Sequence, residues 1–360
     1  MSASPIDRPG RVRAGEELDT EALRAYLRRQ RLGGGGELRV SQFPRGFSNL
    51  TYLVESDGVA RVLRRPPFGV GKGVAHDVVR EARLLQALGT AYGKVPRVLA
   101  ICDDPAVLGA PFYLMERATG IILRDRIPDG VAIDPPLMRR VSAAAVDTLA
   151  EIHAVDRAAA GLASMGRPEG YVERQVGGWS RRFEAARTGA QPDVERIASW
   201  LEASRPPESA CTLVHNDFKY DNLVLAADDP SRVVAVLDWE MATIGDPLMD
   251  LGTTLGYWVE AGDPPALRSL GLGVTALPGN LTRREVVARY EDAAGRTVTN
   301  PVFYYAYGLF KVAVIAQQIY ARFVKGLTRD PRFAGLDQVV STLGAAAVRA
   351  VERGHVGSAP

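Results

Sequence analysis

A short polar connection between two apolar runs holds side chains that could do chemistry together. The stretch LVHNDFKYDNLVL (213–225) carries Asp217, Lys219 and Asn222, and Asp238 ends the next β-like run, VVAVLD. Phosphoryl transfer needs a carboxylate that orients the acceptor hydroxyl and takes its proton, oxygen ligands for Mg²⁺ on the nucleotide, and a cation. A hairpin would bring these residues together. We predict Asp217 as the base, Lys219 as the catalytic cation, and Asn222 and Asp238 as the metal ligands.

The same residues also have an ordinary structural interpretation. Asp217 could simply end a strand, and Asn222 and Asp238 could be turn residues that bond their own backbone. Lys219 could be a solvated loop lysine, and solvent exposure is the default expectation for Asp221. The combination at this spacing favours catalysis over separate structural roles.

Four segments, in this order along the chain, carry a resemblance to a known family. They are GFSNLTYLV (46–54), VLRRPP (62–67), VHNDFKYDNLV (214–224) and AVLDWEMATIGDPLMDLG (235–252). Together they resemble the aminoglycoside phosphotransferase-like branch of the protein-kinase-like superfamily. Within it, the chain looks closest to the kinase-like domains fused to some acyl-CoA dehydrogenases and to their free-standing bacterial relatives.

The resemblance assigns nucleotide-binding roles in the first third of the chain. Gly46, Ser48 and Asn49 match a loop that contacts the β- and γ-phosphates of ATP. Arg64 stands at the position of the basic residue on the third strand, and Glu81 matches the glutamate that pairs with it. This reading implies ATP as co-substrate, with Mg²⁺.

Further positions follow from the same resemblance. Met115 and Glu116 fall where the hinge binds adenine through backbone groups. His215 matches a histidine that braces the catalytic loop, so we expect a structural role for it. Asp246 and Asp250 resemble the pair that anchors this loop to the following helix, and Asp246 is expected to be an N-cap.

The sequence departs from the family pattern at several of these positions. Arg64 replaces the usual lysine, and an arginine can still pair with both phosphate and Glu81 through its planar fork. Arg45 precedes the glycine of the phosphate loop, which lacks a GxGxxG. Asn216 stands where glycine is usual, and Lys219 stands where the antibiotic kinases commonly have histidine.

Secondary-structure signals place these residues in an α+β, bilobal, protein-kinase-like fold. The pattern of LDTEALRAYLRRQ (18–30) predicts a helix, and three β runs follow it, the last two joined by the hairpin signal Asp57-Gly58. One main helix follows, ending near Gly89, and VPRVLAIC and PFYLMER are further β runs. We predict an N-lobe with a small antiparallel sheet over residues 1–116.

The remaining residues, 117–360, are expected to form a helical C-lobe with the catalytic loop and the acceptor pocket. Helical spacing is present in 135–155, in a charged region near 171–203, in TRREVVARYEDAAG, in an aromatic segment near 302–326 and in 334–352. The apolar stretch around Lys311 is interrupted by charge and by a glutamine pair. That favours a buried helix over a membrane span.

Composition limits the partners that the protein could have. The 360 residues carry 44 basic and 42 acidic side chains, a net charge of +2, which gives no reason to expect nucleic acid or membrane as a partner. The two cysteines have no metal-binding spacing, and the first residues show no secretory signal. We expect a cytoplasmic protein with reduced thiols.

The acceptor is expected to be a small molecule with a hydroxyl group. Residues 251–360 hold twelve Lys/Arg and eight Asp/Glu, a net charge of +4, whereas a polycationic aminoglycoside would need an acidic pocket. A neutral or anionic acceptor is therefore favoured, and the resemblance implies a hydroxyacyl compound or its CoA thioester. The alternatives are an aminoglycoside-type antibiotic kinase and a nucleotide-binding pseudokinase. A protein kinase is disfavoured because LDWEMATIGDPLMDLG leaves almost no activation segment.

Overall fold

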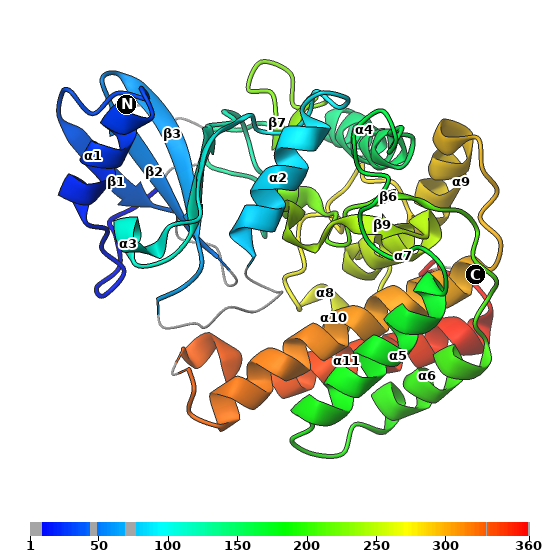
Figure 1. The fold of residues 1–360 in the computed structure, drawn as a ribbon. Helices are drawn as coiled ribbons and strands as arrows, with labels where there is room; N and C mark the ends of the chain where they lie inside the picture. The colour runs from blue at the N-terminus through cyan, green and yellow to red at the C-terminus, as the bar shows by residue number, and fades with distance from the viewer. Residues whose placement is uncertain (1–8, 44–48, 69–76, 329, 359–360) are drawn as a thin grey trace.

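The computed structural model describes residues 9–43, 49–68, 77–328 and 330–358, which form two lobes (Figure 1). The smaller lobe contains one antiparallel sheet, and the larger lobe is mostly helical. This confirms the bilobal α+β fold expected from the sequence. The exact division at residues 116 and 117 stays a prediction.

The N-lobe is built on a five-stranded sheet with the strand order β1-β2-β3-β5-β4. Asp57 and Gly58 join β2 to β3 with φ angles of +53° and +75°, as a two-residue hairpin turn requires. The elements are α1 (Thr20–Arg29), β1 (Leu38–Gln42), β2 (Leu50–Ser56), β3 (Val59–Arg65), α2 (Val78–Leu88), β4 (Val98–Cys102), α3 (Pro105–Leu108) and β5 (Phe112–Glu116).

The two faces of this sheet pack against different partners. On one face, Leu23, Tyr26 and Leu27 of α1 join a core with Tyr52 and Phe112, as the helical spacing predicted. Helix α2 lies between the sheet and the C-lobe (Figure 1), and its apolar residues belong to the core of the larger lobe. The second face of the sheet therefore looks toward the C-lobe through α2.

A close backbone contact joins the segment after β5 to the C-lobe. Ile121 exchanges two hydrogen bonds of 2.8 Å with Leu225. A Cβ at Gly120 would lie 2.2 Å from the Leu225 carbonyl oxygen, so only glycine fits there without moving the backbone.

Two short sheets and a group of long helices make up the C-lobe. The pair β6 and β9 forms one sheet, and β7 and β8 form the other. The elements are α4 (Pro135–His153), α5 (Tyr171–Ala186), α6 (Pro192–Ala203), β6 (Thr212–Val214), η2 (Tyr220–Asn222), β7 (Leu223–Leu225), β8 (Val233–Val236), η3 (Trp239–Met241), β9 (Thr243–Gly245), α7 (Pro247–Tyr257), α8 (Pro265–Arg268), α9 (Arg283–Ala294), α10 (Pro301–Val324), η4 (Pro331–Phe333) and α11 (Leu336–Arg353).

Some of these elements were not expected from the sequence. The charged region near 171–203 forms two helices, because Pro192 starts a new helix at a position where its missing N–H is harmless. The three-residue strand β9 and the one-turn helices α3 and α8 are too short to give a periodic signal.

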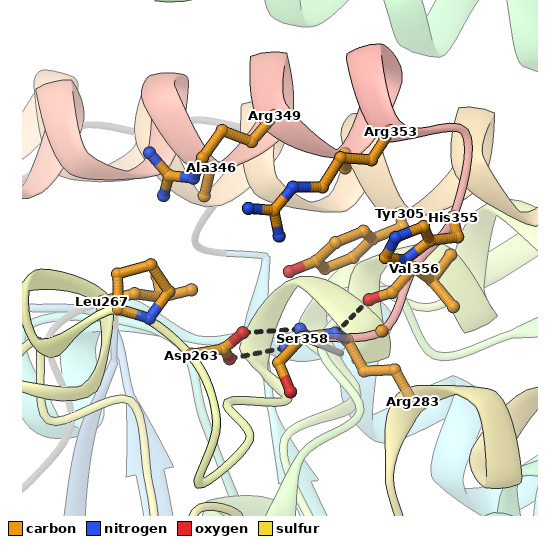
Figure 2. Close-up of a pocket in the computed structure, with 13 residues that line it drawn as sticks. Asp263, Leu267, Arg283, Tyr305, Ala346, Arg349, Arg353, His355, Val356 and Ser358 are labelled. Carbon is orange, nitrogen blue, oxygen red and sulfur yellow. Dashed lines mark hydrogen bonds and ion pairs between the residues drawn. The ribbon is translucent and has the colours of Figure 1, made fainter. Parts of the chain in front are cut away.

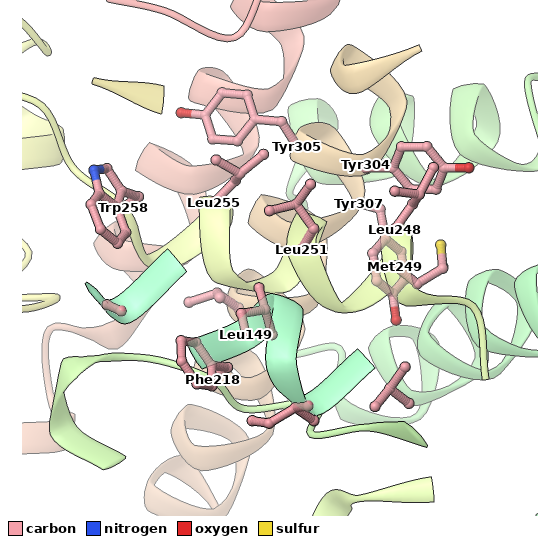
Figure 3. Close-up of a cluster of buried hydrophobic side chains, with 14 of the residues drawn as sticks. Leu149, Phe218, Leu248, Met249, Leu251, Leu255, Trp258, Tyr304, Tyr305 and Tyr307 are labelled. Atoms are coloured by element: carbon pink, nitrogen blue, oxygen red, sulfur yellow. The ribbon is translucent and has the colours of Figure 1, made fainter. Parts of the chain in front are cut away.

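The core of the C-lobe is centred on α7 and α10, which lie against each other (Figure 3). Gly252 and Gly256 of α7 face Gly308 of α10, and a Cβ at Gly308 would lie 1.8 Å from the Gly252 carbonyl oxygen. Leucines of α7 and tyrosines of α10 fill the surroundings of this crossing. The contact fixes the helix that carries Asp250.

Helix α10 lies within this core, as the charges in its sequence predicted. Its Lys311 is only 1% exposed. Among the helices of the described residues, none combines the length and the apolar character needed to span a membrane.

Candidate active site

The loop from His215 to Asn222 connects β6 to β7, and Asp250 of α7 holds its backbone in place. One oxygen of the Asp250 carboxylate accepts the His215 N–H at 2.6 Å, and the other accepts the Asn216 N–H at 2.8 Å. His153 of α4 contacts the same carboxylate at 3.1 Å. Burial alone would raise the pKa of Asp250, but these hydrogen bonds hold it below its ordinary value.

His215 is fully buried and its two ring nitrogens have different partners. Nε2 lies 2.9 Å from the Leu237 carbonyl oxygen, and Nδ1 accepts the Asp217 N–H at 3.2 Å. These contacts fit a neutral ring with its proton on Nε2, and burial lowers the pKa of His215 accordingly. The ring braces the loop against the strand end that precedes Asp238.

The backbone conformation of Asn216 shows why glycine is usual at this position. Its φ is +67°, in the left-handed region that asparagine tolerates better than other residues with a side chain. Its side chain accepts from the Tyr171 hydroxyl and donates to the Met241 carbonyl, and its own carbonyl accepts from Lys311 at 2.7 Å. Asparagine therefore fits without distorting the loop.

Asp217, Lys219 and Asn222 are brought together at the surface of the loop. Lys219 Nζ lies 2.8 Å from both carboxylate oxygens of Asp217. The Asn222 amide donates to the Asp217 carbonyl at 2.8 Å and to its carboxylate at 3.0 Å. The side chain of Asp217 is 16% exposed, so the carboxylate is fixed but still reaches solvent.

Tyr257, at the end of α7, borders this group. Its ring lies 4.6 Å from Lys219 Nζ, a cation–π arrangement. Burial alone would lower the pKa of Lys219. The attraction of the Asp217 carboxylate is larger than this effect, so the pKa of Lys219 lies above its ordinary value. Lys219 therefore holds its proton firmly and pairs with the Asp217 carboxylate.

Asp238 follows β8 and lies next to the loop. The Leu237 N–H donates to the Asn222 carbonyl at 2.8 Å, which brings the strand end beside Asn222. Asp238 has a left-handed φ of +66°, and its side chain is 32% exposed. Asp217, Asn222 and Asp238 thus come from two chain segments that are joined by a backbone hydrogen bond.

Arg64 of β3 connects the N-lobe to Asp238. Its guanidinium lies 3.3 Å from Glu81 of α2 and donates to Asp238 at 2.9 Å. Burial alone would raise the pKa of Asp238, but Arg64 holds it below the ordinary value. The expected pairing of Arg64 with Glu81 is present, and its role in nucleotide binding stays a prediction.

Glu240 of η3 also belongs to this group, although the sequence reasoning missed it. It accepts from the Asn49 side chain at 2.8 Å and lies 3.5 Å from Arg64. The spacing of the two acidic residues in DWE was visible, but nothing local indicated a partner on the N-lobe. Asn49 is 3% exposed, and its Oδ1 has no hydrogen-bond partner among the described residues.

Helix α2 attaches the N-lobe to the same segment. Glu81 accepts the Trp239 N–H at 3.2 Å, and Arg80 donates to the carbonyls of Glu240 and Ala242 at 3.2 and 2.6 Å. These contacts hold the lobes together beside Asp238.

The remaining predicted residues lie at different distances from this centre. Gly46 and Ser48 lie outside the described residues. Met115 is buried in β5, whereas Glu116 is exposed and its side chain pairs with Arg97. The Glu116 N–H donates to the Arg97 carbonyl, so an adenine contact at Glu116 would have to use its carbonyl oxygen. Adenine binding at this hinge stays a prediction.

Two aspartates near the loop have structural contacts. Asp246 accepts the Leu248 N–H at 2.8 Å and caps α7, as expected, and it also accepts from Ser209. Asp221 was expected to be solvent-exposed, but it is half-buried and has an interaction partner.

Several contributors to this site gave no signal in the sequence. His153, Tyr257 and Lys311 lie on helices far from the loop in the chain and look like ordinary members of amphipathic or apolar helices. Only their spacing in three dimensions shows that they contact the loop or its anchor. A buried charge within an apolar run, as at Lys311, was the one available hint.

The oxygen atoms of this site fit a magnesium–nucleotide complex. Asn222 donates through its amide nitrogen, which leaves Oδ1 for a metal, and Arg64 contacts Asp238 through only one of its oxygens. In the part of the chain that the structure describes, no three His, Cys, Asp or Glu side chains form a metal cluster. Mg²⁺ commonly uses one or two protein oxygens and completes its shell with phosphates and water.

Comparison with known proteins gives a family for this geometry. A profile of the phosphotransferase enzyme family (APH) matches residues 39–285. Acyl-CoA dehydrogenase family member 10 of Mus musculus is 36% identical over 326 residues, which cover 89% of this chain but 30% of the relative. The chain thus spans less than a third of that relative's length.

Solved structures agree with this relationship. A candidate aminoglycoside phosphotransferase from Ralstonia eutropha has a TM-score of 0.78 and 31% identity, with 94% of this chain and 99% of the other covered. Aminoglycoside phosphotransferase APH(4)-Ia in complex with AMP-PNP and hygromycin B has a TM-score of 0.58 at 17% identity, covering 91% and 98%, and shows the shared fold alone. The family resemblance seen in the motifs is confirmed, and so is the expectation of a phosphotransferase: the chain belongs to the phosphotransferase enzyme family.

Proposed function

We propose that the protein transfers the γ-phosphate of ATP, with Mg²⁺, to a hydroxyl group of a small neutral or anionic molecule. The observation that carries this proposal is the Asp217 carboxylate, held by Lys219 at 2.8 Å and by Asn222 at 3.0 Å. A partly exposed carboxylate fixed beside two candidate oxygen ligands is the arrangement that phosphoryl transfer to an alcohol requires.

Each residue has a defined task in this reaction. Asp217 accepts a hydrogen bond from the acceptor hydroxyl and takes its proton as the hydroxyl oxygen bonds to phosphorus. The bond between the γ-phosphorus and its bridging oxygen breaks, and ADP leaves. Lys219 and Arg64 offset negative charge on the phosphates. Asn222 and Asp238 would hold Mg²⁺, which supplies charge neutralisation on the phosphates when bound.

The ion pairs seen in the structure must rearrange when nucleotide binds. Arg64 contacts the oxygen of Asp238 at 2.9 Å, and a bound triphosphate would compete for the same guanidinium. Because arginine presents several donors in one plane, it can keep Glu81 while it turns a second edge toward phosphate. The arginine at this position is therefore compatible with transfer.

The nucleotide assignment rests on this family and on its geometry. The solved relative in complex with AMP-PNP and hygromycin B shares this fold, and AMP-PNP is a non-transferring analogue of ATP. We therefore propose ATP as the co-substrate. Hygromycin B, as a ligand of that protein, keeps an aminoglycoside-type acceptor as the alternative.

The charge of the C-lobe favours a different acceptor. Residues 251–360 carry twelve basic and eight acidic side chains, a net charge of +4, which does not suit a polycation. The curated relative with 36% identity is a member of the acyl-CoA dehydrogenase family. We propose hydroxyacyl compounds, free or as CoA thioesters, as the acceptor class.

The experiment is a measurement of ADP release from ATP and Mg²⁺ with a panel of hydroxyacyl-CoAs, sugars and aminoglycosides. We expect hydroxyacyl compounds to stimulate release and aminoglycosides not to. Asp217→Asn should lower kcat by at least about 10² if Asp217 takes the proton. Asp228→Asn is the matched control, since Asp228 is an exposed loop aspartate that pairs with Arg232 at the surface.

Other outcomes separate the alternatives. Stimulation by aminoglycosides alone would support the antibiotic-kinase alternative. Nucleotide binding without release of ADP in the presence of any acceptor would support a pseudokinase. Wild-type turnover by Asp217→Asn would exclude the proposed role of that carboxylate.

A further inference from the structure

A pocket with a cavity volume of about 30 Å³ opens in the C-lobe, away from the Asp217 site (Figure 2). Its walls come from α8, the start of α9, α10, α11 and the segment that follows α11. No residue that lines it belongs to the catalytic loop or to the Asp238 segment. Its charged residues need a separate explanation.

An arginine whose charge is balanced by two carboxylates lies at the base of the pocket. Arg283 makes a two-pronged contact with Asp263 at 2.7 and 2.6 Å and lies 3.5 Å from Glu260. It also donates to the carbonyls of Trp258 and Val356. Two carboxylates and two carbonyls therefore take up its donors, so Arg283 supports the pocket and has little left for a ligand.

Two further arginines on α11 have no such partners. Arg349 and Arg353 are four residues apart, so they share one face of the helix, and both extend toward the pocket (Figure 2). Neither makes a hydrogen bond or an ion pair with any of the described residues. By contrast, Glu352 on the same helix pairs with Arg196 at 2.9 Å. Like charges four residues apart destabilise a helix slightly; Arg349 is half-buried, whereas Arg353 is exposed.

His355 adds a third unmatched group to the same pocket. Its Nδ1 is shielded from solvent and has no hydrogen-bond partner within the described part of the chain. Buried polar nitrogens are nearly always paired in native proteins. The ring of His355 lies beside Tyr305 at the wall (Figure 2), close to the side of the pocket that Arg353 covers.

We propose that this pocket binds a phosphate group through Arg349, Arg353 and His355. Three arginines against Asp263 and Glu260 leave a charge of +1 before the histidine is counted, and a phosphate ester carries roughly −1.5 to −2 at neutral pH. Asp263 also faces the pocket, but Arg283 holds both of its oxygens. Guanidinium groups are the preferred partners of phosphate because they donate in a planar fork.

The phosphate could be free or part of a larger ester, and both sources present the same chemistry to the pocket. The test is calorimetric titration of the full chain with inorganic phosphate, at constant ionic strength and with ADP and Mg²⁺ already saturating the nucleotide site. Arg349→Gln and Arg353→Gln should each weaken binding about tenfold or more. Arg196→Gln is the matched control, because Arg196 pairs with Glu352 of the same helix but does not line the pocket.

A second readout locates the ligand. The chain has four histidines, so the ring signals of His355 in an NMR spectrum can be assigned from a His355→Gln variant. Phosphate should move the His355 signals at the concentrations found by calorimetry. Unchanged affinity in both arginine variants, or unmoved His355 signals, would overturn the proposal. A parallel titration with glycerol 3-phosphate distinguishes the sources, since tighter binding than inorganic phosphate indicates an ester and weaker binding indicates the free ion.

Discussion

Arg64 of β3 donates a 2.9 Å hydrogen bond to Asp238, which lies 174 residues further along the chain. The same guanidinium contacts Glu81 of α2 at 3.3 Å. A single side chain therefore joins the sheet, the N-lobe helix and the strand end of the C-lobe. This arginine therefore helps to fix the relative position of the lobes, and we predict that nucleotide binding depends on it as well.

Removal of the Arg64 charge should damage both activity and stability. In Arg64→Met, Glu81 is left as a buried carboxylate without its cation, which costs about 3 kcal/mol or more of unfolding free energy. We expect kcat/KM for ATP to fall by at least about 10². Steady-state ADP release and urea unfolding measure the two effects. Arg64→Lys should recover part of both, because it restores the charge but not the planar fork.

Arg61 provides the matched control for this substitution. It lies on the same strand, is 7% exposed and, within the described part of the chain, donates only to the Val59 carbonyl at 3.4 Å. Arg61→Met should leave kcat/KM near the wild-type value. Equal losses in the Arg61 and Arg64 variants would show that the effect comes from the strand and not from the contact with Asp238.

Asp250 is expected to act on turnover by positioning the loop. In Asp250→Asn, an amide group replaces one of the oxygens that accept the N–H groups of His215 and Asn216, so two donors face each other. We expect kcat to fall about tenfold or more while KM for ATP changes little, because the N-lobe contacts remain. Asp134→Asn is the control, since exposed Asp134 caps α4 by accepting the Leu137 N–H through one oxygen, and asparagine caps a helix nearly as well as aspartate. A change confined to KM would contradict the positioning role.

The sequence could group the residues of the loop from His215 to Asn222 because they are close together in the chain, and their catalytic roles stay a prediction. Asp217, Lys219 and Asn222 contact one another within one turn, and spacing alone was enough to group them. The contacts of Glu240 with Asn49 and of Lys311 with Asn216 join residues that lie far apart in sequence. No local pattern encodes such pairs, because they arise only when helices and sheets have packed.

The elements of the fold were likewise predictable only where a local sequence pattern indicates them. Hydrophobic periodicity identified the long helices, including the buried α10, because an apolar stripe must face a core. It did not identify β9, whose three residues are defined by their pairing with β6. The phosphate loop of the sequence prediction includes Gly46 and Ser48, which lie outside the described residues.

The crossing of α7 and α10 should tolerate no added methyl group. In Gly308→Ala, the new Cβ would lie 1.8 Å from the Gly252 carbonyl oxygen, so the helices must separate. We expect the free energy of unfolding to fall by about 3 kcal/mol, together with a loss of activity because α7 carries Asp250. Thermal unfolding and ADP release measure these effects. Gly335→Ala is the control, since nothing lies within 4 Å of its Cβ position, and an equal loss there would contradict the packing argument.

Lys311 is a buried cation whose hydrogen-bond partners are uncharged. Its Nζ donates to the Asn216 carbonyl at 2.7 Å and to the Thr253 hydroxyl at 3.3 Å, and it lies 5.5 Å from the ring of Trp179. The carboxylates of Asp250 and Asp217 act on it only at longer range. Burial lowers the pKa of Lys311 to about 8, from an ordinary value of 10.5. The ammonium is therefore held in place for its contact with the loop at a cost in stability.

The lowered pKa of Lys311 predicts that the free energy of unfolding rises with pH above about pH 8. Between pH 8 and 10.5 the unfolded chain binds a proton at Lys311 that the folded chain has lost, so the wild-type free energy of unfolding rises with pH across this window. The Lys311→Met variant has no group that titrates at this position. The stability of the wild type relative to Lys311→Met should therefore rise by up to about 3 kcal/mol between pH 7 and pH 10, as urea unfolding at the two pH values can measure. Lys325→Met, at an exposed position after α10, should show no such change. A pH-independent difference for Lys311→Met would mean that the ammonium keeps its proton throughout.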